Sequence, residues 1–167
     1  MAAYSQNELD ELISCPKEVS EPPRREMELD GANWRNDAKL VASNRIQGDF
    51  AMFMRKNEDF PENFSIGLIY NPNDERGKII LLRCNGKHGD FNRSFNPAHS
   101  HFDYHIHRAS EDAIEAGLSP EKDAVKTTEF ASFEEGLQFF LKEVNLNTKD
   151  AGKHFPAIHP NLFDIER

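Results

Sequence analysis

The stretch from His99 to Arg108 constrains the fold more than any other, because its side chains alternate in polarity with a period of two. Successive side chains of a β-strand point to opposite faces, so this stretch predicts a strand with one polar and one apolar face. A helical period would scatter the apolar residues instead. The polar set is His101, Asp103, His105 and His107, and the apolar set is Phe102, Tyr104 and Ile106. We expect the apolar face to pack on the core and the histidine row to face solvent.

Other segments carry the signals of further strands and helices. Alternating or continuous apolar runs predict strands at residues 40–42, 49–55, 64–70 and 78–83, and a loop rich in turn-forming residues separates the last two. Serines followed by acidic residues are typical of helix N-termini. We therefore expect helices to begin near Ser5, Ser110 and Ser132, and the last of them has an apolar stripe that extends to Val144.

These elements predict an α+β fold. We expect a single curved antiparallel sheet of four or five strands in a meander, with the C-terminal helix packed on one face and a further helix at the N-terminus. The length suits a single domain, 1–167. Residues 16–37 contain three prolines and are expected to form an irregular arm. Residues 148–167 are expected to form a C-terminal tail that docks on its own domain or on a partner, including a second copy in a homodimer.

The composition argues against several classes of protein. The net charge of −9 and the pI near 5.2 disfavour a general binder of DNA or of membrane surfaces, because such proteins carry a basic excess. No apolar stretch is long enough for a membrane helix. The two cysteines form no CxxC pair, and the N-terminus lacks the pattern of a signal peptide, so a cytoplasmic protein is expected.

The histidine row, together with nearby arginines, could form a metal-independent phosphodiesterase site. Imidazole titrates near neutral pH, so two histidines can act as general acid and general base, while an arginine stabilises the phosphorane. The candidate catalytic residues are His105, His107, His88 and Arg83. The candidate binding residues are Arg55, Asn85, His101, Asp103 and Arg108. This hypothesis requires no cofactor and would make the chain a ribonuclease.

Two alternatives remain open. In the first, the His-x-His pair formed by His105 and His107 binds Zn²⁺, Ni²⁺ or Fe²⁺, with His101, Asp103 or His88 completing the ligand set. In the second, the chain is a non-catalytic binding module for another protein, and the histidines only line a surface. No serine-nucleophile, Walker or dinucleotide-binding motif is present in the sequence.

The order of several motifs resembles that of small bacterial and phage proteins of the TumE-like toxin type, together with related families of unknown function. The resemblance covers about residues 64–145 and includes a strand that ends Leu-Leu-Arg-Cys-Asn, the turn Gly-Lys-His-Gly, a His-x-His strand and a Phe-rich helix. It implies a toxin that is partnered by an antitoxin and acts on RNA. It also implies a shared site made of Arg83, Asn85, His88, His105 and His107.

Overall fold

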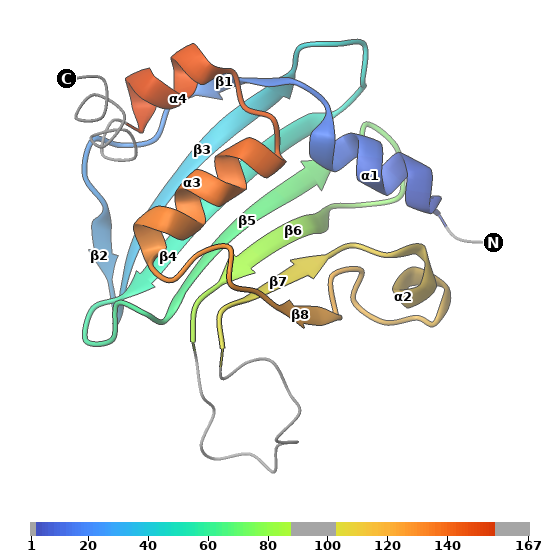
Figure 1. Cartoon of the computed structure of the whole chain (residues 1–167). Helices are drawn as coiled ribbons and strands as arrows, with labels where there is room; N and C mark the ends of the chain where they lie inside the picture. Colours follow the sequence, from blue (N-terminus) through green and yellow to red (C-terminus); the bar gives the residue numbers. More distant parts are fainter. Residues whose placement is uncertain (1–2, 88–102, 156–167) are drawn as a thin grey trace.

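The computed structural model describes residues 3–87 and 103–155. Their architecture is α+β, with one open antiparallel sheet and four helices (Figure 1). The described strands number eight, so the expected four or five is wrong. They are β1 (Lys17–Glu21), β2 (Glu28–Asp30), β3 (Asn33–Ala42), β4 (Asp49–Asn57), β5 (Phe64–Asn71), β6 (Ile79–Asn85), β7 (His105–Arg108) and β8 (Ala124–Lys126).

The strands from β3 to β8 form a meander in which each strand pairs with the next along the chain. The strand β1 pairs antiparallel with β3 at the other edge of the sheet, and β2 pairs with the N-terminal part of β3. The connections from β3 to β6 are short, as is usual between antiparallel neighbours, whereas residues 86–104 join β6 to β7 and the β7–β8 connection contains α2.

The expectation of an irregular arm at residues 16–37 is wrong for much of its length, because β1, β2 and the start of β3 lie within it. The polar side chain of Asn36 hides the alternation of β3. Asn36 is buried because its amide forms two hydrogen bonds, both of 3.0 Å, with the main-chain N–H and carbonyl of Arg24. A polar residue satisfied in this way occupies a core position that the hydrophobic pattern does not reveal.

Four helices complete the described fold: α1 (Gln6–Ser14), α2 (Glu111–Glu115), α3 (Phe133–Glu143) and α4 (Thr148–His154). The helices α1, α3 and α4 lie on one face of the sheet, and α2 lies beyond the end of β7 (Figure 1). The expected starts of α1, α2 and α3 are confirmed. The hydroxyls of Ser5, Ser110 and Ser132 each accept a hydrogen bond of 3.1 Å from a main-chain N–H of the first turn. Each serine therefore satisfies one of the N–H groups that have no partner within the helix.

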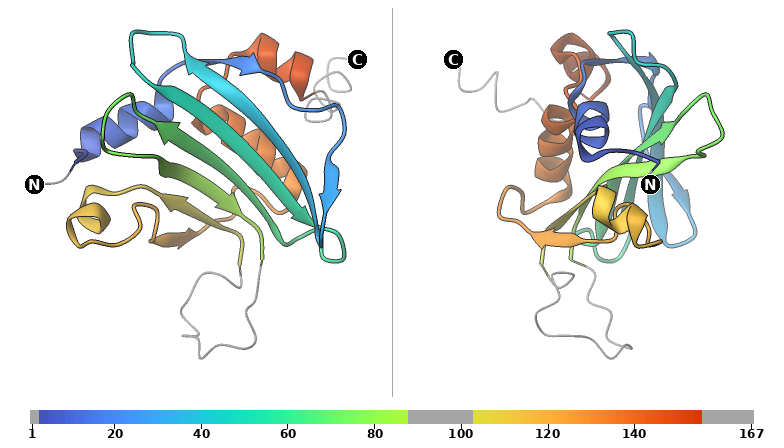
Figure 2. Two further views of the ribbon diagram at one scale, coloured as in Figure 1. Left: turned by 180° about the vertical axis from the view of Figure 1, so that it is seen from behind. Right: turned by 90° about the vertical axis from the view of Figure 1, so that its right-hand side faces the viewer.

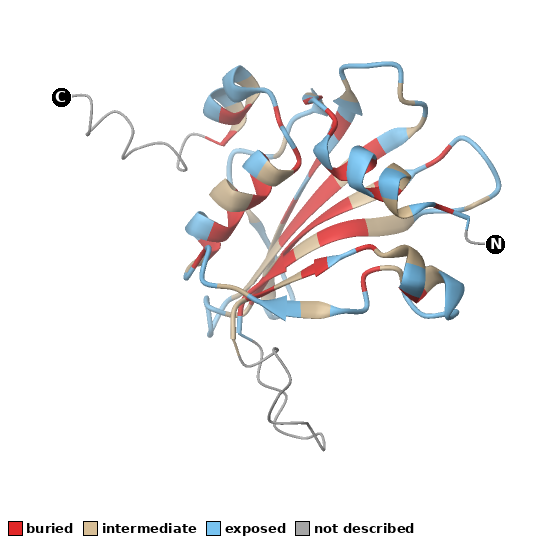
Figure 3. Cartoon of the chain, turned by 45° about the vertical axis from the view of Figure 1, so that its right-hand side comes forward, coloured by how far each residue is buried: buried red, intermediate tan, exposed pale blue. Residues whose placement is uncertain are grey.

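The core lies between the sheet and the helices α3 and α1. Figure 3 shows buried residues along the central strands and at intervals along α3. Phe64 of β5 packs its ring against Phe130 and Phe133 beside α3, with ring centroids 6.1 and 5.7 Å away. In the C-terminal tail, Ala151 and Phe155 belong to the same core, whereas residues 156–167 lie outside the described residues.

The described helices include none whose length and apolar character would let it cross a membrane.

Candidate functional site

The sheet face turned away from α3, which we call the open face, has no described helix over it (Figure 2, left). Strand register aligns its side chains in rows that run across the sheet. One row is Arg35, Arg55, Ser65, Asn85, His105 and Lys126. The next row is Asp37, Phe53, Gly67, Arg83, His107 and Ala124. Arginines and histidines from segments far apart in the sequence therefore share one face.

Four of the predicted site residues form one cluster on the open face. Arg83 of β6 lies directly opposite His107 of β7, and Asn85 lies opposite His105. Side chains of directly opposed residues in antiparallel strands are neighbours. The two imidazole rings meet edge to face, with centroids 5.0 Å apart. We call Arg83, Asn85, His105 and His107 the His–Arg cluster.

Both imidazoles of the cluster are buried, so the expectation that the histidine row faces solvent is wrong for His105 and His107. The exposed fraction is 0% for His105 and 3% for His107. The Nδ1 atoms lie 2.8 Å from the main-chain carbonyl oxygens of Asp103 and Glu121, respectively. The Glu121 contact arises because the connection between α2 and β8 returns to β7, where β8 pairs with the same strand. The main chain of this connection thus contacts the polar side of β7 at His107.

These contacts fix the tautomers of the two rings. A carbonyl oxygen only accepts hydrogen bonds, so each Nδ1 carries the proton and each Nε2 carries the lone pair in the neutral ring. A ring held in this way could serve as a base or as a metal ligand through Nε2. Access is restricted, because both rings are closed off from solvent.

Two polar atoms near this end of the sheet are buried without a hydrogen-bond partner. They are Nε of Arg83 and Oε2 of Glu121, and the rest of the Arg83 side chain is half-buried. Buried polar groups in proteins are rarely left without a partner. Asn85, in contrast, is satisfied, because its Oδ1 accepts a hydrogen bond of 2.8 Å from the hydroxyl of Ser65.

Arg55 is held in place by an aromatic ring. Its guanidinium carbon lies 4.7 Å from the ring centroid of Phe53, within the range of a cation–π contact. The Phe53 ring in turn lies against Gly67, where an added Cβ would come within 2.2 Å of the ring. The glycine therefore makes room for the ring, and the ring positions the arginine.

The remaining predicted residues lie outside the cluster. The carboxylate of Asp103 lies 3.6 Å from Nζ of Lys126 in an exposed ion pair. Arg108 points to the other face of the sheet and forms an ion pair of 2.6 Å with Glu143 of α3. Arg108 is therefore on the face opposite to the His–Arg cluster, whereas the Asp103 carboxylate pairs with Lys126, the residue directly opposite His105. His88 and His101 lie outside the described residues.

The described residues contain no group of three or more histidine, cysteine or carboxylate side chains that could hold a metal ion. Two imidazoles from one His-x-His pair supply fewer ligands than a structural or catalytic zinc site uses. The third ligand expected from the sequence, His101, lies outside the described residues. The metal hypothesis therefore stays a prediction.

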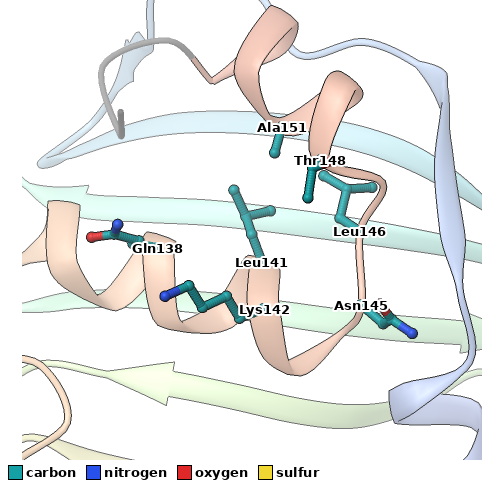
Figure 4. Close-up of a pocket in the computed structure, with 7 residues that line it drawn as sticks. All are labelled: Gln138, Leu141, Lys142, Asn145, Leu146, Thr148 and Ala151. Carbon is teal, nitrogen blue, oxygen red and sulfur yellow. The ribbon is translucent and has the colours of Figure 1, made fainter. Parts of the chain in front are cut away.

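The surface has two hollows that are lined in part by apolar side chains. A groove of about 490 Å³ lies on the open face beyond Phe53, and its lining includes Val41, Ala51 and Ile69. A smaller hollow of about 230 Å³ lies between α3 and α4, with Leu141, Leu146 and Ala151 at its base (Figure 4). The first adjoins the rows of the candidate site, whereas nothing in the structure indicates what would occupy the second.

Sequence reasoning missed Phe53, Gly67 and Glu121 as parts of this region. A glycine inside a strand pattern is a signal for close approach of another group, and Gly67 fits that signal. Glu121 gives no comparable signal, because its part in the cluster depends on a main-chain carbonyl.

Comparisons of this chain with protein-family models, with curated proteins and with solved structures found no match. The resemblance to TumE-like toxins therefore stays a prediction from the residues alone.

Proposed function

We propose that this chain is a non-catalytic binding module whose open face docks an acidic segment of a partner protein. The observation that carries the proposal is a pair of arginines, Arg55 and Arg83, which have no carboxylate partner among the described residues. The chain contains 29 acidic and only 20 basic residues, so carboxylates are abundant.

One further arginine and two lysines of the open face are already paired. Arg35 lies 2.7 Å from Asp30, and Lys126 and Lys39 each lie within 4 Å of a carboxylate. Arginine binds carboxylates through two parallel N–H groups, which favours a carboxylate ligand at the two remaining guanidiniums. Acidic partners of an acidic chain need such a local cationic site, because the overall field repels them.

The buried histidines support binding rather than cleavage. A general base must reach the proton that it abstracts within hydrogen-bond distance. His105 and His107 are closed to solvent, and their Nδ1 atoms bond to the main chain. In this proposal the rings act as rigid support beside Arg83.

The test uses a short acidic peptide as a defined probe, because the partner itself is unidentified. Peptide binding is followed by the backbone amide shifts of the labelled protein. We expect the shifts to concentrate on β4, β5 and β6 and to disappear in the double variant Arg55→Glu/Arg83→Glu. The charge-matched control is Lys149→Glu/Lys153→Glu on exposed positions of α4. Equal responses in the two double variants, or no response of the parent protein, would overturn the proposal.

A ribonuclease of a toxin–antitoxin system is the second candidate function. The specific observation in its favour is that the Nδ1 contacts place the lone pair of each neutral ring on Nε2, and that His107 lies directly opposite Arg83 in the sheet. Expression should then arrest growth and cleave RNA, and His105→Asn and His107→Asn should abolish both effects. Asparagine retains a donor near the Nδ1 position, which limits structural damage. Parent and variants that behave alike would reject this candidate.

A further inference from the structure

The groove on the open face continues the surface that carries Arg55 and Arg83. Its lining includes three aliphatic side chains, Val41, Ala51 and Ile69, from the neighbouring strands β3, β4 and β5. Val41 is 40% exposed, and Ala51 and Ile69 are partly exposed. Two lysines and two carboxylates, Lys39, Lys78, Glu21 and Asp49, stand at its border. An apolar floor with a charged border is the usual form of a site for one apolar side chain.

The groove and Arg55 lie along the same strand at a defined spacing. Ala51, Phe53 and Arg55 occupy alternate positions of β4, so all three side chains point to the open face. A strand rises about 3.4 Å per residue, which places Ala51 and Arg55 about 14 Å apart along β4. Phe53, the residue between them, is covered by the Arg55 guanidinium.

An extended segment lying over β4 has the same rise as the strand below it. Its side chains that face the sheet recur at every second residue, so residues i and i+4 of the segment span the same distance. An amphipathic helix buries a continuous apolar stripe, so a helical partner would need a continuous apolar surface on the sheet. The open face instead offers aliphatic side chains at one end and guanidinium groups at the other.

We propose that the partner segment is an extended polypeptide whose apolar side chain fills the groove over Ala51 and Ile69, and whose carboxylate, four residues away, binds Arg55. This inference rests on the proposed binding function and specifies the chemistry of the partner. Arg55, which has no carboxylate partner among the described residues, would bind the acidic side chain of the segment. The exposed aliphatic side chains of the groove would bind its apolar side chain.

The probe is a threonine-rich peptide that carries leucine at position i and glutamate at position i+4. One comparison peptide has the same composition with leucine and glutamate adjacent, so that they face opposite sides. A second comparison peptide replaces the leucine with threonine. Affinities are measured by titration of the labelled protein. We expect each comparison peptide to bind about tenfold more weakly than the probe, the loss expected for one unburied leucine side chain.

The matching protein variants are Val41→Asn/Ile69→Thr for the groove and Arg55→Glu for the cation. The groove variant should bind the probe and the peptide without leucine equally well. It should still bind the probe more tightly than a peptide in which glutamine replaces the glutamate. Arg55→Glu should lose the preference for glutamate. If the groove variant binds the probe as the parent does while Arg55→Glu fails to bind, the extended apolar anchor is refuted and the acidic docking function stands. If neither variant changes the affinity, both proposals fail.

Discussion

Replacing Lys17 by methionine removes an ammonium group that joins the ends of two helices. Lys17 is fully buried at the start of β1, and its Nζ donates hydrogen bonds to the carbonyls of Ile13, Cys15 and Val144 at 2.8, 2.9 and 2.9 Å. Ile13 lies in the last turn of α1, and Val144 is the C-cap residue of α3. Carbonyls at helix C-termini lack partners within the helix, and a cation there also interacts favourably with the helix dipole.

The expected cost of Lys17→Met follows from two opposing effects. Three buried carbonyls lose their donor, at about 2 kcal/mol for each unsatisfied acceptor. Against this, burial lowers the pKa of Lys17 from 10.5 to about 8. That shift corresponds to a desolvation penalty of about 3 kcal/mol, which methionine avoids. We therefore expect the substitution to lower the free energy of unfolding by about 3 kcal/mol.

Urea titration at neutral pH, followed by circular dichroism, measures this difference. The control is Lys39→Met, which removes an exposed lysine of β3 that lies 3.5 Å from the carboxylate of Glu21. The control should change the free energy of unfolding by less than about 0.5 kcal/mol. Two variants of equal stability would refute the idea that the three carbonyls depend on Lys17.

The pH dependence of the same difference has a definite sign. The folded pKa of about 8 lies below the unfolded value of 10.5, so the unfolded chain binds more protons at Lys17 between these values. The contribution of Lys17 to stability is therefore largest above the unfolded pKa of 10.5 and decreases, as the pH falls through 8, to the smaller value expected at neutral pH. Other titrating groups are common to parent and variant and cancel. The advantage of the parent over Lys17→Met should grow between about pH 8 and about pH 10, and a shrinking advantage would contradict the reasoning.

Three further predictions concern packing, capping and thiol access. Gly67→Ala would place a Cβ 2.2 Å from the Phe53 ring, so it should cost about 1–3 kcal/mol in urea titration, and adding Phe53→Leu should recover part of the loss. Ser132→Ala removes the N-cap acceptor of α3 and should cost about 1 kcal/mol, seen as a lower thermal midpoint. Cys84 is fully buried and burial raises the pKa of its thiol, so mass spectrometry should detect its alkylation only after denaturant unfolds the chain.

The alternation of the histidine strand predicts which side chains share a face, but it does not predict which face is buried. The shared face follows from backbone geometry, which is why the register places Arg83 opposite His107. The burial depends on the connection after α2, which carries the carbonyl of Glu121 to the imidazole of His107. No property of the strand's own residues specifies that long-range contact.

The extra strands were missed for a related reason. The strands β2 and β8 have three residues each, which is too short for a period to appear. The N-terminal half of β3 contains Asn36 and Asp37, which read as polar loop residues. Asn36 is nevertheless buried, because its amide pairs with the main chain of Arg24, twelve residues earlier in the sequence. Side chain to main chain contacts of this kind are set by tertiary structure and leave no periodic signal.

The sheet register shows which residues lie opposite the two arginines that have no carboxylate partner among the described residues. A carboxylate at position 65 would stand directly opposite Arg55, yet that position holds a serine whose hydroxyl donates to Asn85. Leaving an accessible arginine without a carboxylate costs little stability, because exposed ion pairs contribute only about 0–1 kcal/mol. A carboxylate partner for Arg55 within the chain would therefore change the free energy of unfolding very little. A ligand carboxylate would gain most at a guanidinium that is already positioned, as Phe53 positions Arg55, because less side-chain freedom is lost on binding. The placement of Arg55 on its aromatic support is what the proposed recognition of a carboxylate would require.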